Sequence, residues 1–204
     1  MVVVMSQLTP TAIKEFKTGF AGSVLLPDNP QYDEVRQIWN AMIDRRPSMV
    51  ARCTSPADVV HALNFVRQHN VPFSLRGGGH NIAGNAVCDE GVMIDLSPMK
   101  KVDIDQQHHQ GHVEPGCTLA EFDTAAQAYG LATPLGINST TGVAGLTLGG
   151  GFGWLSRKYG LTVDNLLGVD VITADGQPNS YMPANQKTST YSGGCEAGAG
   201  TLVS

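Results

Sequence analysis

The sequence predicts an α+β fold, because strand and helix patterns alternate along only part of the chain. A strand, a helix and a second strand follow one another between Ser48 and Leu75. A hairpin pattern follows at residues 101–115, and a capped helix comes directly after it. Only the first of these three features is an α/β unit, so a doubly wound sheet is disfavoured.

Residues 1–45 are expected to form a helical lead-in to a domain of residues 46–176. Apolar residues at helical spacing predict a short amphipathic helix over Thr9–Ala21 and a turn and helix over Tyr32–Ile43. The next segment, Ser48–Cys53, has the pattern of a short strand.

A longer helix begins at Ser55-Pro56, where Ser is the N-cap, Pro fits the first turn and Asp58 lies near the positive end of the helix dipole. The helix is expected to end near Asn70. The following segment, Val71–Leu75, predicts a strand that runs into a glycine turn.

The second half of the domain predicts a strand over Val92–Leu96 and then a hairpin. Lys101–Asp105 and Gly111–Pro115 alternate with period two around a polar turn. Thr118 and Glu121 form a capping-box pattern for a helix that reaches Tyr129 and stops at Gly130.

A glycine-rich stretch over Thr133–Gly160 is expected to be part loop and part buried helix. Phe152, Trp154 and Tyr159 are expected in the core, with Arg157 and Lys158 on a solvated face. Val169–Thr173 predicts a last strand, which leads into a turn at residues 174–176.

The composition excludes several classes of protein. The formal net charge of −5 argues against a nucleic-acid partner or a basic membrane-binding patch, and 42% hydrophobic with 15% charged residues excludes a disordered chain. The cysteines form no C-x-x-C pair, so no zinc or other metal site is expected. We see no signal peptide or membrane span and expect a cytoplasmic protein.

Two glycine clusters carry the functional signal. Arg76-Gly-Gly-Gly-His80-Asn81 follows a strand, and Gly142-Val-Ala-Gly145 precedes Gly149-Gly-Gly-Phe-Gly153. Consecutive glycines expose backbone N–H groups, which suits a pyrophosphate. Walker and Rossmann motifs are absent, because Asn85-Ala86 stands where a P-loop needs Lys-Ser/Thr and no G-x-G-x-x-G occurs.

Plainer interpretations exist for the same residues. His80 alone could be an ordinary loop residue, and Gly149–Gly153 could be a helix-packing surface. The first two of His108, His109 and His112 lie in the expected hairpin turn, so a solvated turn is favoured over a metal site. Cys117, at the start of the capped helix, is expected to be a small buried residue.

Taken together, the two clusters resemble the PCMH-type (vanillyl-alcohol-oxidase-type) FAD-binding domain, built of two small α/β subdomains. The closest resemblance is to the berberine-bridge-enzyme and 6-hydroxynicotine-oxidase group. Ser74–Gly84 is similar to the flavin-attachment loop, and Gly136–Asn165 is similar to the second FAD segment.

The resemblance implies that FAD is the cofactor and that His80 is joined covalently to its 8α-methyl group. Arg76 to His80 would hold the pyrophosphate, Gly149–Gly151 would pack under the isoalloxazine, and Val171 would lie near the adenine. Asn138 stands where bicovalent relatives have Cys, so only the His link is expected. The cofactor-binding residues implied are Arg76, Gly77, Gly78, Gly79, His80, Asn81, Gly136, Ser139, Thr140, Thr141, Gly142, Gly145, Gly149, Gly150, Gly151 and Val171.

Residues 177–204 depart from that family, in which a D-L-F-W-x-x-R-G-G-G-G-N-F-G-type segment and then a substrate domain follow. This tail is polar and lacks a core pattern, which is typical of disorder. Our sharper hypothesis is a frameshift: shifting the frame by one base from Gln186 onward permits Glu-Asn-(Leu/Val)-Asp-Leu-Phe-Trp-Gly-Val-Arg-Gly-Gly-Gly-Gly-Asn-Phe-Gly. The chain would then be a C-terminally truncated flavoenzyme without a substrate domain.

The activity implied by the resemblance is oxidation of a C–OH or C–N group of a small molecule, with hydride transfer to the flavin and O₂ as electron acceptor. The small-molecule substrate would belong to the full-length parent, and no catalytic base can be named. The alternatives are a catalytically dead FAD-binding fragment and a nucleotide binder without flavin.

Overall fold

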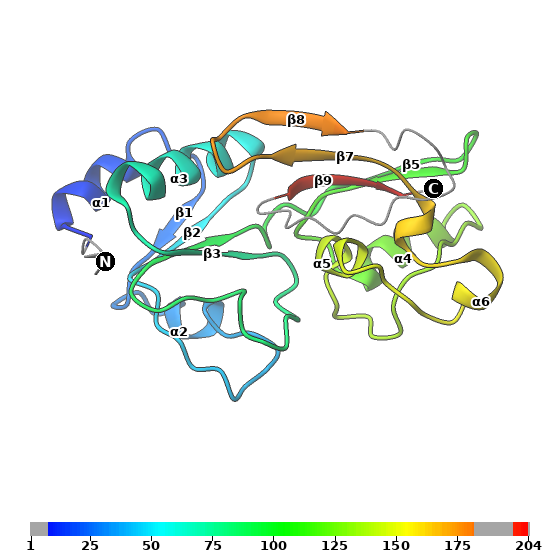
Figure 1. Ribbon diagram of the computed structural model, residues 1–204, viewed down its shortest axis with the longest axis horizontal. Coiled ribbons are helices and arrows are strands. Elements are labelled where there is room, and N and C mark those ends of the chain that lie inside the picture. The colour runs from blue at the N-terminus through cyan, green and yellow to red at the C-terminus, as the bar shows by residue number, and fades with distance from the viewer. Residues whose placement is uncertain (1–7, 182–197, 204) are drawn as a thin grey trace, which may run out of the picture.

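Two sheets lie side by side in the computed structural model, which describes residues 8–181 and 198–203 (Figure 1). The first sheet has four strands in the order β1-β2-β4-β3, and the second has five in the order β5-β6-β9-β7-β8. The mixed α/β architecture agrees with the fold class that the sequence predicts.

The first sheet is mainly parallel. Its strands are β1 (Ser23–Leu25), β2 (Met49–Arg52), β3 (Phe73–Arg76) and β4 (Val92–Asp95). Strand β4 pairs in parallel with both β2 and β3, and β1 adds an antiparallel edge that the sequence analysis missed. The predicted strand–helix–strand unit is therefore confirmed, but β4 lies between its two strands.

Both faces of this sheet are buried, as is usual for parallel sheets. Met49 and Ile94 point to the face covered by α1 (Pro10–Lys17) and α3 (Pro56–His69), where Phe16 and Leu63 complete the core. On the opposite face, Val50 and Met93 pack with Tyr32 of the short helix α2 (Tyr32–Val35). The helix predicted to continue to Ile43 ends at Val35.

Helix α3 begins as its sequence predicts. Ser55 Oγ accepts from the Asp58 backbone N–H at 3.2 Å, and Asn70 ends the helix in the left-handed conformation (φ 49°). Asp58 is almost fully buried and joins the helix to two other segments. It accepts from the Ala21 backbone N–H at 2.9 Å, and from the N–H and hydroxyl of Thr54 at 2.9 and 2.8 Å.

The second sheet is antiparallel. The predicted hairpin is confirmed as β5 (Val102–Asp105) and β6 (Gln110–Val113), and β7 (Leu166–Ile172) pairs with β8 (Pro178–Tyr181). Strand β9 (Gly198–Val203) lies between β6 and β7. Strands β8 and β9 fall in the segment that we expected to be a tail, and residues 182–197 and 204 lie outside the described residues.

Helix α4 (Leu119–Gln127) packs Leu119 and Phe122 against this second sheet. The predicted capping box is present: Glu121 Oε2 accepts from the Thr118 backbone N–H at 2.7 Å. The glycine-rich stretch contains helices α5 (Val143–Leu148) and α6 (Ser156–Tyr159), and a 3₁₀ turn at Val163–Asn165 precedes β7. Helix α5 is only partly buried, through Val143 and Thr147.

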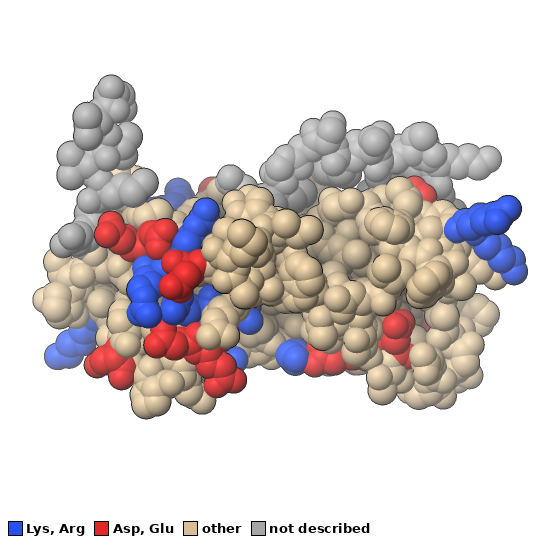
Figure 2. All heavy atoms as spheres, turned by 90° about the horizontal axis from the view of Figure 1, so that it is seen from below, with Lys and Arg blue, Asp and Glu red and all other residues tan. Residues whose placement is uncertain are grey.

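The aromatic residues around α6 are not in the core, so that expectation was wrong. Trp154 is 85% exposed, Phe152 70% and Tyr159 52%. The segment is too short, and too interrupted by glycine, to turn these rings inward. On the face shown in Figure 2, many acidic and basic side chains gather on the half of the molecule that holds the first sheet, and fewer lie on the other half. No helix of the described residues is long and apolar enough to cross a membrane.

The carboxylate of Asp58 should stabilise the fold in a pH-dependent way. Burial alone raises the pKa of Asp58, but its hydrogen bonds to Thr54, Ala21 and Ser55 outweigh this effect and hold the pKa below the usual value. The stabilisation is therefore present above the unfolded-state pKa of about 3.9 and is lost as the pH falls through the folded-state pKa.

We expect Asp58→Asn to lower the free energy of unfolding at pH 7 by about 1.5–3 kcal/mol, because the backbone N–H groups of Ala21 and Thr54 lose a charged acceptor. The same variant should show a smaller loss of stability between pH 5 and pH 2 than the parent. Urea unfolding at each pH measures both effects. Asp28→Asn, at an exposed position, is the matched control. Equal stability of the two variants at pH 7 would contradict this role.

Candidate functional site

The two glycine clusters meet at the junction of the two sheets. The first follows β3 and the second begins α5, and their backbones touch at Gly78 and Gly142. A Cβ atom on Gly78 would lie 2.4 Å from the Gly142 nitrogen, and one on Gly142 would lie 2.6 Å from the Gly78 nitrogen. A side chain at either position would therefore force the loops apart.

A cleft of about 470 Å³ lies along this contact. Eight of the predicted cofactor-binding residues line it: Gly77, Gly78, Gly79, His80, Asn81, Thr141, Gly142 and Gly145. The sequence analysis missed the other lining residues, which are Leu75, Asn85, Ala86, Leu96, Pro115, Ala144, Leu146 and Leu148. Leu75 and Leu96 could have been found, because they lie at the carboxyl ends of adjacent parallel strands, where ligands bind in open sheets.

The lining has the polar groups and the space that a phosphate-containing ligand needs. Within the described residues, the backbone N–H groups of Gly77–Asn81 donate no hydrogen bond. Such a run of N–H groups is suited to binding an anion. Gly145 lies inside α5, yet a Cβ at this position would meet no atom within 4 Å. Glycine at this position weakens the helix, although an alanine methyl group would meet no steric clash. The space beside Gly145 is therefore part of the cleft.

His80 is held at the edge of the cleft by three side chains. Its Nε2 lies 2.9 Å from Thr140 Oγ1, and its Nδ1 lies 3.5 Å from Thr141 Oγ1. Its ring stacks on Trp39, with centroids 5.2 Å apart and planes 23° apart. Burial lowers the pKa of His80 below the ordinary value of 6.5, so the imidazole is neutral at pH 7.

Trp39 was expected to be one apolar position of a helix, but it lies in a loop, 58% exposed, against His80. No local sequence signal marks this role, because the two residues are far apart in the chain. The loop is bound directly to the attachment loop: the Trp39 backbone N–H donates to the Gly79 carbonyl at 3.0 Å, and Asn40 Nδ2 donates to the Ile82 carbonyl at 2.8 Å.

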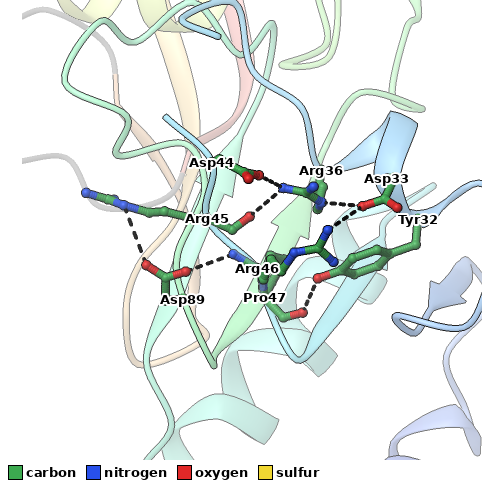
Figure 3. A network of polar contacts seen from close by, with 8 residues as sticks. All are labelled: Tyr32, Asp33, Arg36, Asp44, Arg45, Arg46, Pro47 and Asp89. Atoms are coloured by element: carbon green, nitrogen blue, oxygen red, sulfur yellow. Dashed lines mark hydrogen bonds and ion pairs between the residues drawn. The ribbon is translucent and has the colours of Figure 1, made fainter. Parts of the chain in front are cut away.

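A polar network fixes the ends of this loop (Figure 3). The buried Arg36 guanidinium donates to Asp33 at 2.8 Å, to the Arg45 carbonyl at 3.1 Å, and to Asp44. The hydrogen bond from Arg36 holds the pKa of Asp44 below its usual range. Tyr32 donates to the Pro47 carbonyl at 2.6 Å, which closes the loop.

The same network extends to the far end of the attachment loop. Arg45 donates to the carbonyls of Gly84 and Val87, each at 3.0 Å. Asp89 accepts from the Arg46 backbone N–H at 2.8 Å (Figure 3). The backbone segments before and after His80 are thus both hydrogen-bonded to residues 32–47.

Several predicted residues do not line the cleft. Arg76 points behind the loop, where it donates to the Val35 carbonyl and has its Nε buried without a partner among the described residues. Thr140 does not line the cleft itself, but its Oγ1 contacts the Nε2 of His80, which does. The remaining ones are Gly136, Ser139, Gly149, Gly150, Gly151 and Val171. Of these, Gly136 packs under α5 and Val171 is buried in β7.

No group of three or more His, Cys, Asp or Glu side chains within the described residues could hold a metal ion. His108 binds Asp105 through Nδ1 at 2.6 Å in the exposed hairpin turn. Cys117 is fully buried, and burial raises its pKa to about 11, so it is not a nucleophile at neutral pH.

Comparison with known proteins identifies the family of this chain. The profile of a family described as "FAD binding domain" matches residues 47–178, and the chain belongs to this family. The glycine cradle and the space at Gly145 fit the diphosphate-containing cofactor that the family description names.

The relatives are FAD-linked oxidoreductases. The chain is 38% identical to the uncharacterized FAD-linked oxidoreductase YgaK of Bacillus subtilis (strain 168), over 78% of this chain and 35% of that protein. It is 36% identical to (R)-6-hydroxynicotine oxidase of Paenarthrobacter nicotinovorans, over 76% of this chain and 34% of the relative.

The fold agrees with a solved structure of the same group. The crystal structure of 6-hydroxy-D-nicotine oxidase from Arthrobacter nicotinovorans superposes with a TM-score of 0.82 at 30% identity, covering 91% of this chain and 43% of that one. These findings confirm the resemblance inferred from the sequence. The chain spans about a third of the length of the curated relatives it matches.

Gly145→Ala should separate cofactor binding from folding. Alanine adds about 1 kcal/mol or less to helix stability, but its methyl group occupies cleft space. We expect at least about tenfold weaker FAD binding, the equivalent of ~1.4 kcal/mol. Flavin fluorescence titration in a His80→Ala background measures the affinity. By contrast, Gly78→Ala should lower the free energy of unfolding, because its Cβ meets backbone. Unchanged affinity in the Gly145 variant would contradict the assignment of this cleft.

Proposed function

We propose that this chain holds FAD in the cleft between the two sheets and forms a covalent bond to it through His80. The observation that carries the proposal is the position of a neutral, ordered imidazole next to a run of free backbone N–H groups. The N–H groups of Gly77–Asn81 bind the diphosphate, and Gly145 leaves room for it.

The chain's own residues prepare His80 in two ways. Burial favours the neutral imidazole, which has a free lone pair and can act as a nucleophile. Trp39 and Thr140 fix the ring from its face and its edge, so little rotational freedom is lost when the bond forms.

In the complete flavoenzyme we propose oxidation of a C–OH or C–N group of a small molecule with O₂ as acceptor. The bound flavin supplies the hydride acceptor. The support is the similarity to proteins named as oxidases and FAD-linked oxidoreductases. The protein's part here is to bind the cofactor and to prevent its loss.

A second candidate is an FAD-binding fragment without turnover, and one observation favours it. Phe152 and Trp154 expose large apolar surfaces, and this chain matches about a third of the length of its relatives. Tight flavin without oxidation of any substrate in an oxidase screen would support the fragment. Substrate oxidation with peroxide release would support the enzyme.

The covalent bond is tested by the intact mass of the purified chain under denaturing conditions. We expect the mass of the chain plus one FAD, and the bare mass for His80→Ala. Because the neutral imidazole reacts, the rate of attachment to flavin-free protein should rise with pH through the lowered pKa of His80 and be level at pH 7. A bare mass in a yellow native sample would show non-covalent FAD and refute the bond.

A further inference from the structure

The hydrogen bonds around His80 determine which of its nitrogens carries the proton. Asn138 Oδ1 accepts from the Thr140 backbone N–H at 3.2 Å and lies 2.9 Å from Thr140 Oγ1. Since an N–H can only donate, this atom of Asn138 is the amide oxygen and cannot donate in return. The proton of the Thr140 hydroxyl therefore points at Asn138.

The same hydrogen bonds place the proton of His80 on Nε2. Thr140 Oγ1 has no further proton to donate, so its 2.9 Å contact with His80 Nε2 requires a proton on Nε2. A neutral imidazole has one N–H, so the lone pair is on Nδ1. The longer Thr141 contact to Nδ1, at 3.5 Å, leaves that lone pair only weakly engaged.

We propose that Asn138 and Thr140 are positioning residues that hold the proton of His80 on Nε2 and present Nδ1 as the atom that bonds to the flavin. This inference rests on the covalent bond proposed above and names the residues that prepare it. Trp39 stacks on the ring and limits its rotation about the Cβ–Cγ bond, which would exchange Nδ1 with Cδ2 and Nε2 with Cε1.

Nδ1 bonds to the 8α carbon of the flavin as one C–H bond of that methyl group breaks. The electron pair of this C–H bond reduces the flavin by two electrons, and the methyl proton and the Nε2 proton pass to solvent. Dioxygen, as oxidant, then takes two electrons and two protons to give hydrogen peroxide, and the flavin returns to its oxidised state.

The hydrogen-bond chain lowers the barrier of this step. Positive charge builds on the imidazole as Nδ1 forms its bond, and the Nε2–H···Oγ1 hydrogen bond disperses it. The Thr140 hydroxyl donates its own proton to Asn138, and hydrogen bonds in a chain polarise one another. Its oxygen is therefore a stronger acceptor for Nε2–H than an isolated hydroxyl would be. A threonine that only shaped the loop would have no such effect.

The test compares three variants of the full-length chain, prepared without flavin and then mixed with FAD. Thr140→Val removes the acceptor, Thr140→Ser restores it, and Thr124→Val removes an exposed hydroxyl of α4 that does not line the cleft. Intact mass over time gives the attachment rate. We expect Thr140→Val to be slower by about tenfold or more, and the other two variants to stay near the parent rate. An unchanged rate in Thr140→Val overturns the proposal.

A second readout does not depend on flavin. Two-bond ¹H–¹⁵N correlation spectra of ¹⁵N-histidine-labelled, flavin-free chain report the tautomer of each ring, and His80→Ala identifies the His80 signal. We expect Nε2–H in the parent and in Thr140→Ser, and a larger share of Nδ1–H in Thr140→Val. If the parent never binds FAD covalently, the proposed bond fails, and an unchanged tautomer in Thr140→Val would overturn the positioning role separately.

Discussion

The backbone contact between Gly78 and Gly142 is the constraint on which the site depends. It joins the loop after β3, in the first sheet, to the start of α5, which packs on the second sheet. From the sequence, these glycines were expected to expose backbone N–H groups to an anion. Two of them instead let one loop touch the other, and the backbone N–H groups of Gly77–Asn81 donate no hydrogen bond within the described residues.

The attachment loop is held from a third direction by residues 32–47. Individual surface ion pairs contribute little to stability, but this network includes the buried Arg36 and hydrogen bonds to several backbone carbonyls. Its effect is to place Trp39 over His80. The His80 ring is therefore positioned by segments on both sides of it in the sequence, with Trp39 before it and Thr140 after it.

The two halves of the molecule differ in the surfaces that they expose. The half with the first sheet carries the polar network and the attachment loop, and its core is closed on both faces. The half with α5 and α6 leaves Phe152 and Trp154 in solvent. The cleft lies where the two halves meet.

The sequence by itself determined the local structure and the cofactor class. The caps at Ser55 and Thr118 and the alternation of the hairpin are local patterns, and the two glycine clusters identified an FAD-binding domain. Only the tertiary structure decided that β4 separates β2 from β3, that α6 exposes its aromatic rings, and that Trp39 and Thr140 converge on His80. Caps and alternation depend on residues a few positions apart, whereas strand order and side-chain convergence depend on packing between distant segments, which no local pattern records.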